Sequence, residues 1–144
     1  MRGEVEMQTT GAAIIAFLDA VQSGEWRDME VLYAPDAIFD GTVPEWHFTI
    51  QGAGTVIEEL GRWFPATATL SDVRIEPTVH GAAIEFERRW NRAGEMDTPP
   101  EMVGVRQAHI LKIVHGRIVE QRAHCSGIWD AATFATIEAE APRL

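Results

Sequence analysis

The chain has 144 residues, of which 46% are hydrophobic and 24% charged, and its formal net charge is −10 at pH 7. This length fits one domain with a real hydrophobic core, and the ordinary composition argues against intrinsic disorder. The negative charge makes nucleic acid and anionic membranes unsuitable partners, because both would repel the chain.

Few signals point outside the cytoplasm. The single cysteine, Cys125, cannot form an internal disulfide, and the N-terminal stretch has no apolar run like that of a signal peptide. No segment approaches the roughly 18 consecutive apolar residues of a membrane-spanning helix. We therefore expect a cytoplasmic protein.

The N-terminal part begins without periodicity, so residues 1–9 are interpreted as a flexible tail and residues 10–144 as a single domain. Thr10 can cap a first helix, whose apolar stripe runs to about Ser23. Gly24 ends this helix.

Shorter elements follow. A second helix is predicted from Trp26 and is stopped by Pro35, since the residue before a proline avoids the helical conformation. Residues 36–41 are predicted to form a short strand, and residues 43–50 an extended connection. A third helix is predicted over residues 52–64, with an apolar side facing the core.

The pattern then changes from helical to alternating. Four long strands are predicted at residues 66–76, 80–91, 103–113 and 118–125. A loop containing glycine and proline is expected at residues 91–100, and Asp130 can cap a last helix through Ala139. This order predicts an α+β fold: a curved, cone-shaped sheet of four long strands and one short strand, wrapped around N-terminal helices.

Several stretches together resemble one known family. They are residues 17–26 (FLDAVQSGEW), residues 33–39 (YAPDAIF), Gly52 before the third helix and residues 116–120 (GRIVE). Their order and spacing resemble the NTF2-like superfamily, in its SnoaL-like and ketosteroid-isomerase-like branch. The resemblance implies a mixed or antiparallel curved sheet with a short C-terminal helix, and acid/base residues on its inner face. An apolar wall there would raise a carboxyl pKa towards neutrality and make proton transfer useful.

Asp40 is the first catalytic candidate. It ends the predicted short strand, near the point where ketosteroid-isomerase-like enzymes hold their proton acceptor. An alignment on Asp36 and Ala37 instead puts Gly41 at that position. Asp40 is also compatible with a turn aspartate that binds the following backbone amides.

His109 is the second catalytic candidate. Alternation along its strand puts it on one face with Gln107, while Arg106 and Lys112 mark the other face as the outer one. A neutral imidazole inside the cone could relay a proton or hold a carbonyl oxygen. The alternative is a histidine satisfied by a cross-strand partner.

Arg88 lies between Phe86 and Trp90 on the inner face of the preceding strand. It is interpreted as a counter-ion to Asp40 or to a ligand anion, or as a stem that lies along apolar surface. Loop residues suit ligand contact, which favours Trp46 and His47 near the mouth of the cone. The alternative for Trp46 is an apolar lid over the helices.

The chain departs from better-known relatives. The oxyanion-donating tyrosine of ketosteroid isomerases corresponds to Phe17, which cannot donate that hydrogen bond. The water-activating site of limonene-epoxide-hydrolase-like members is also missing, because Arg88-Arg89-Trp90 lacks its first aspartate and Ala123 stands at its second. Chemistry like that of scytalone dehydratase would need paired inward histidines and an aspartate. Asp40 and His109 meet this requirement only in part.

Two functions stay open. The first is a cofactor-independent acid/base enzyme, of isomerase, cyclase, dehydratase or hydrolase type, in which Asp40 and His109 act on an apolar, oxygenated small molecule. The second is a non-catalytic cone that binds a small apolar ligand or dimerises. The ligand-binding candidates are Phe17, Trp46, His47, Trp63, Arg88, Trp90 and Gln107.

The sequence also bears on metals, cofactors and protein partners. The histidines lack HExxH or CxxC spacing, so no metal or other cofactor is expected. A homodimer through the outer sheet face is expected, because a two-fold axis would let opposite charges meet there. The charged row consists of Glu85, Glu87, Arg89, Arg106 and Lys112.

Overall fold

The structure is a computed structural model that describes residues 2–93 and 99–140, with side chains from Thr9 onward. In chain order the elements are α1 (Arg2–Ser23), the 3-10 helix η1 (Arg27–Leu32), β1 (Tyr33–Val43), β2 (Trp46–Gln51), α2 (Ala53–Trp63), β3 (Thr69–Thr78), β4 (Gly81–Arg92), β5 (Glu101–Val114), β6 (Arg117–Cys125) and α3 (Ala131–Glu140). None of the described helices combines the length and apolar character needed to cross a membrane.

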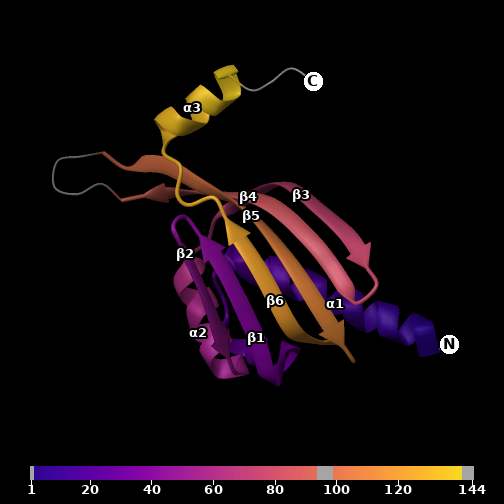
Figure 1. Ribbon diagram of the computed structural model, residues 1–144. Coiled ribbons are helices and arrows are strands. Elements are labelled where there is room, and N and C mark those ends of the chain that lie inside the picture. The colour runs from indigo at the N-terminus through magenta and orange to yellow at the C-terminus, as the bar shows by residue number, and fades with distance from the viewer. Residues whose placement is uncertain (1, 94–98, 141–144) are drawn as a thin grey trace.

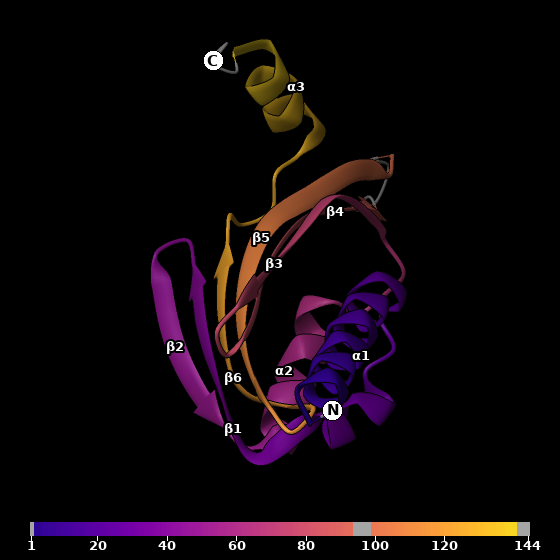
Figure 2. The same cartoon turned by 90° about the vertical axis from the view of Figure 1, so that its right-hand side faces the viewer.

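One curved sheet and two helices form the body. The strand order in the described residues is β2-β1-β6-β5-β4-β3, and all neighbours are antiparallel except β1 and β6, which run parallel. Figures 1 and 2 show the sheet curling around α1 and α2, which lie on its concave side, while α3 stands beyond one end. The predicted α+β cone is confirmed.

The first strands are longer than predicted. The short strand expected at residues 36–41 is the 11-residue β1, and the expected extended connection contains β2, which pairs with β1. The chain reverses at Pro44 and Glu45, where Glu45 takes a left-handed φ of 64°. The sequence prediction was wrong here because β1 lies between two strands, and its pairing with β6 joins residues far apart in the chain.

Helix boundaries also differ from the prediction. α1 begins at Arg2, whereas the pattern predicted a helix only from Thr10 after a flexible tail. The second predicted helix is the 3-10 turn η1. The Asp130 cap of α3 is confirmed, because the Thr133 N–H donates to Asp130 Oδ1 over 2.7 Å. Part of the predicted loop, residues 94–98, lies outside the described residues.

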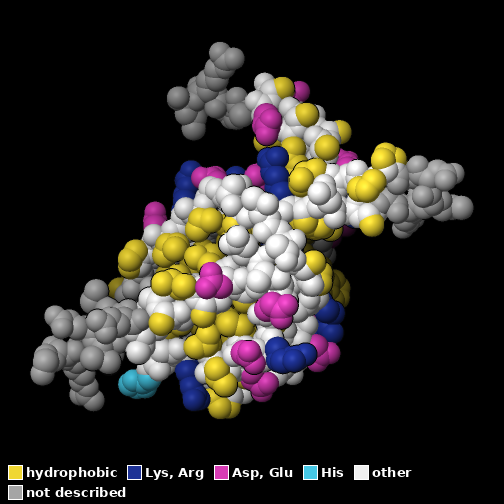
Figure 3. Space-filling model, turned by 180° about the vertical axis from the view of Figure 1, so that it is seen from behind, with side chains coloured by type: hydrophobic (Ala, Val, Ile, Leu, Met, Phe, Trp, Pro, Cys, Tyr) yellow, Lys and Arg dark blue, Asp and Glu magenta, His cyan; other side chains and the backbone are white. Residues whose placement is uncertain are grey.

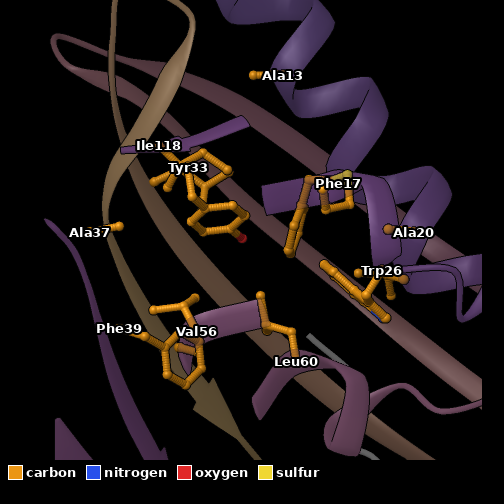
Figure 4. Close-up of a cluster of buried hydrophobic side chains, with 14 of the residues drawn as sticks. Ala13, Phe17, Ala20, Trp26, Tyr33, Ala37, Phe39, Val56, Leu60 and Ile118 are labelled. Atoms are coloured by element: carbon orange, nitrogen blue, oxygen red, sulfur yellow. The ribbon is translucent and has the colours of Figure 1, made fainter. Parts of the chain in front are cut away.

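The core lies between the helices and the concave face of the sheet. Figure 4 shows Phe17 and Trp26 on the helical side, across from Tyr33, and Phe39 near the α2 side chain of Val56. All five are buried. This apolar packing fixes the distance between the helices and the sheet.

The charges of the outer sheet face pair within the chain. Glu87 lies 2.8 Å from Arg89, and Arg106 lies 3.0 Å from Asp72. Such exposed pairs contribute little to stability. Homodimerisation through this face stays a prediction from the sequence.

Gly24 follows the end of α1 and packs against the segment after α2, and it provides a test of the packing. Its φ is +77°, and a Cβ there would lie 2.8–2.9 Å from backbone atoms of Ala66. We expect Gly24→Ala to lower the free energy of unfolding by about 2 kcal/mol, because it adds both strain and overlap. The measurement is urea unfolding.

Gly61→Ala is the matched control. Gly61 lies inside α2 and a Cβ there meets nothing within 4 Å. The helix propensity of alanine should make this variant more stable by about 0.5–1 kcal/mol. Equal midpoints for the two variants would contradict the proposed packing of Gly24.

Candidate functional site

The register of the sheet decides which side chains face the concave side. One row across the sheet joins Ile84, His109, Ala123, Gly41 and Phe48 on β4, β5, β6, β1 and β2. Residues of one row point to the same face, and neighbours along a strand point to opposite faces. Because His109 and Ile84 are fully buried, this row belongs to the concave face.

Asp40 therefore lies on the outer face. It belongs to the adjacent row, in which its partner is Arg122, and its Oδ1 lies 2.6 Å from Nε2 of His47. Both side chains of this pair are partly exposed. The predicted juxtaposition of Asp40 with His109 is wrong, and so is an ion pair between Asp40 and Arg88. Gly41, which the alternative alignment put at the catalytic position of the family, lies in the concave-face row.

His109 lies in a continuous chain of hydrogen bonds. The Tyr33 hydroxyl donates to Gln121 Oε1 (2.5 Å), and Gln121 Nε2 donates to His109 Nδ1 (2.9 Å). His109 Nε2 then donates to Gln107 Oε1 (2.8 Å), and Gln107 Nε2 donates to Cys125 Sγ (3.3 Å). This direction of donation requires a neutral imidazole with its proton on Nε2.

Aromatic rings enclose the imidazole. The ring of Phe86 stacks on His109 at 5.5 Å, and Phe17, Phe64 and Trp63 lie 5.1, 6.2 and 6.5 Å away. Burial in this environment lowers the pKa of His109 to about 3. His109 faces inward as predicted, and Gln121 on β6 is a cross-strand partner of the kind that the alternative interpretation expected. Phe17 belongs to the fully buried packing around it.

An open cavity lies beyond this packed region, between the end of α2 and strands β4 and β5. Its volume is about 420 Å³, within the range of small-molecule sites. We call it the mouth pocket, and its lining residues are Val43, Arg62, Trp63, Pro65, Ala66, Arg88, Trp90, Val105, Gln107, Cys125, Gly127 and Ile128.

The mouth pocket brings together four of the predicted ligand-binding residues, Trp63, Arg88, Trp90 and Gln107. The alternation along β4 and β5 identified the last three. Cys125 also lines the mouth pocket but was not among the predicted site residues, although it follows the inward-facing Ala123 at the spacing of one face. That spacing was the available signal.

Trp46 and His47 lie elsewhere. Both are on β2, outside the mouth pocket, and Trp46 is 67% exposed. Trp46 pairs with the last residue of β1, at the tip of the hairpin. The structure therefore separates these two residues from Arg88 and Gln107, and their ligand roles stay predictions.

Arg88 connects the pocket wall to the helical layer. Its Nε donates to the carbonyl oxygen of Val21 over 3.0 Å, and its Nη2 donates to that of Ala66. The guanidinium lies 5.3 Å from the ring of Phe64 and 5.1 Å from that of Trp90. Burial lowers the pKa of Arg88 to about 10, so it stays charged at neutral pH.

A second cavity, of about 630 Å³, lies at the other end of the cone. Its wall includes Ile14 of α1 and Val79 and His80 of the β3–β4 turn. Val79 and His80 are exposed, and Figure 3 shows apolar side chains gathered on the side from which α1 covers the sheet. This cavity contains none of the predicted site residues, and no group of potential metal ligands occurs among the described residues.

Burial of His109 makes stability depend on pH. Below the ordinary histidine pKa of 6.5 the unfolded chain binds a proton at His109, whereas the folded chain does not until about pH 3. The free energy of unfolding should therefore fall with decreasing pH in this window, by about 1.4 kcal/mol per pH unit from this group. His109→Gln should show a correspondingly smaller slope in urea unfolding at several pH values.

His80→Gln is the matched control, because it replaces a histidine on the surface. Wild-type protein and His109→Gln with the same slope would contradict the buried, neutral state of His109.

Comparison with known proteins agrees with this architecture. The family model of the SnoaL-like domain matches residues 14–121. Comparison with curated proteins gives no match.

Solved structures with low sequence identity share the fold. An NTF2-like protein of unknown function from Mesorhizobium loti has a TM-score of 0.62 and 19% identity, with 83% of this chain and 93% of that chain covered. A phenazine biosynthesis-related protein from Pseudomonas aeruginosa has a TM-score of 0.62 and 13% identity, with 95% of this chain and 85% of that chain covered. A steroid delta-isomerase from Pseudomonas aeruginosa has a TM-score of 0.55 and 17% identity, with 92% of this chain and 88% of that chain covered. With the family match over more than half of its length, the chain belongs to the SnoaL-like domain family and has the NTF2-like fold.

Proposed function

We propose that this chain binds a small, apolar organic molecule in the mouth pocket. The walls are formed by the indole rings of Trp63 and Trp90 and by aliphatic side chains, and few polar groups converge on the space. An apolar cavity with a small number of fixed polar groups is the usual form of a small-molecule site. The second cavity fits this description less well, because its histidines are at the surface.

The composition of the pocket wall favours binding over proton transfer. Among the described residues that line the mouth pocket there is no carboxylate and no imidazole. A general acid or base must come within hydrogen-bond distance of the proton that it moves, or one water away. His109 lies behind Gln107 with both ring nitrogens engaged, and Asp40 is on the outer face.

An acid/base enzyme is the second candidate. The observation in its favour is the hydrogen-bond chain that connects His109 through Gln107 to Cys125, since both of these residues line the pocket. One of the structurally similar proteins is a steroid delta-isomerase. Proton transfer along the chain would require both the imidazole and the amide of Gln107 to rearrange, which the buried packing opposes.

A neutral aromatic probe tests the proposed function. We expect 2-naphthamide to bind and to slow the alkylation of Cys125 by iodoacetamide, because Cys125 is the only thiol and lines the pocket. Trp90→Ala should weaken this binding about tenfold or more, through the loss of one aromatic wall. Titration calorimetry and mass spectrometry of the alkylated protein measure these effects.

Trp46→Ala is the matched control, because it removes an exposed indole outside the pocket. It should bind the probe as the wild type does. Absence of any probe binding, or equal losses in the two tryptophan variants, would contradict a ligand site in the mouth pocket.

Asp40→Asn separates the two candidate functions. It should leave 2-naphthamide affinity unchanged and lower the free energy of unfolding by less than about 1 kcal/mol, since it changes only a hydrogen bond between partly exposed side chains. His47→Gln removes the same pair from the other side and should give the same result. A loss of probe affinity in Asp40→Asn alone would place Asp40 in the ligand site.

A further inference from the structure

Arg88 is a buried cation without a carboxylate partner. The side chain is only 2% exposed, and the ion pairs of the described residues leave it out while they include its neighbour Arg89. Its partners are the carbonyl oxygens of Val21 and Ala66 and the rings of Phe64 and Trp90, none of which carries a negative charge. Buried charges in proteins are generally paired, so the missing anion needs an explanation.

The structural contacts of Arg88 occupy only part of its guanidinium. Nε and Nη2 donate to main-chain carbonyls, which hold the end of α1 and the segment after α2 against the sheet. Nη1 makes no hydrogen bond to any described residue. Among the described residues no fully buried side-chain nitrogen lacks a partner, so Nη1 keeps some accessible surface, and Arg88 lines the mouth pocket.

The other cation of the pocket wall is already neutralised. Arg62 lies at the rim, with its guanidinium 2.8 Å from Glu59 and 3.2 Å from Glu58. The mouth pocket therefore offers one uncompensated positive charge beside two indole rings. A ligand with a single negative charge would balance it, whereas a dianion would leave one charge unpaired in an apolar space.

We propose that the ligand of the mouth pocket is an aromatic monocarboxylate, whose carboxylate accepts a hydrogen bond from Nη1 of Arg88 and whose ring packs against Trp90 and Trp63. This inference rests on the proposed function, since it specifies the ligand of the same site. A bound carboxylate accounts for the buried positive charge of Arg88 in a protein of net charge −10. A permanently charged guanidinium is the side chain best suited to bind a carboxylate.

A matched pair of probes tests the charge directly in the wild-type protein. 2-Naphthoate and 2-naphthamide share the ring system and differ in the negative charge. A charge-assisted hydrogen bond of ordinary strength corresponds to about 10- to 100-fold in affinity, so at pH 7 we expect the acid to bind that much more tightly. Titration calorimetry gives the ratio, and protection of Cys125 from iodoacetamide reports that both probes occupy the pocket.

Variants of two neighbouring arginines assign the effect to one residue. Arg88→Gln should reduce the affinity for 2-naphthoate to that for 2-naphthamide and leave the amide affinity within about threefold of the wild type. Arg89→Gln is the matched control, because it removes the same charge from the next residue of β4, on the outer face. It should retain the preference for the acid.

The outcomes separate the two proposals. Binding of neither probe overturns the proposed ligand site itself. Equal binding of acid and amide to wild-type protein overturns only the carboxylate, and this result needs no variant, so it stands even if Arg88→Gln fails to fold. Retention of the acid preference in folded Arg88→Gln, or tighter binding of 2-naphthyl phosphate than of 2-naphthoate, overturns the assignment of a monocarboxylate to Arg88.

Discussion

The concave face of the sheet buries polar side chains, and the rest of the molecule is arranged so that each keeps a hydrogen-bond partner. Gln121, His109 and Gln107 satisfy one another across β5 and β6, and Tyr33 donates to the first of them. Arg88 instead uses main-chain carbonyls of the helical layer. An unsatisfied group here would cost about 1–3 kcal/mol, so this network constrains how the helices can lie on the sheet.

The same network gives the two parts of the hollow different chemistry. Around His109 the space is filled by aromatic rings, and burial keeps the imidazole neutral by lowering its pKa. Near the open end the network finishes at Gln107 and Cys125, and Arg88 adds a fixed positive charge. Along the concave face the polar side chains thus change from a neutral, enclosed imidazole to a charged guanidinium in the pocket wall. The proposed ligand would bind at the charged end, where recognition of an anion needs no movement of the core.

Local patterns in the sequence were sufficient to orient β4 and β5. Alternation placed Arg88, Trp90, Gln107 and His109 inside, and the structure agrees, because both strands pair antiparallel with sequence neighbours. Asp40 was misplaced since the face of β1 depends on its parallel pairing with β6, which no local pattern encodes. The same long-range contact explains why β1 was predicted as a short strand. The pocket itself arises from the packing of α2 against the sheet, and sequence spacing does not determine how much space that packing leaves.

Gly41 is consistent with the proposed ligand site at the mouth of the cone. The resemblance to ketosteroid-isomerase-like enzymes puts a catalytic carboxylate at this inner position, in the same row as His109. Here the glycine leaves room that the ring of Phe48 occupies, since a Cβ at Gly41 would lie 2.5 Å from the Cζ of that ring, and Phe39 lies close by. An acidic side chain could not enter without displacing these rings. In this chain, the position that the resemblance gives to a carboxylate is packed against rings of the hydrophobic core. The proposed ligand therefore uses the next open space along the concave face, where the charged group is a cation, and the proposed chemistry is anion recognition instead of proton abstraction.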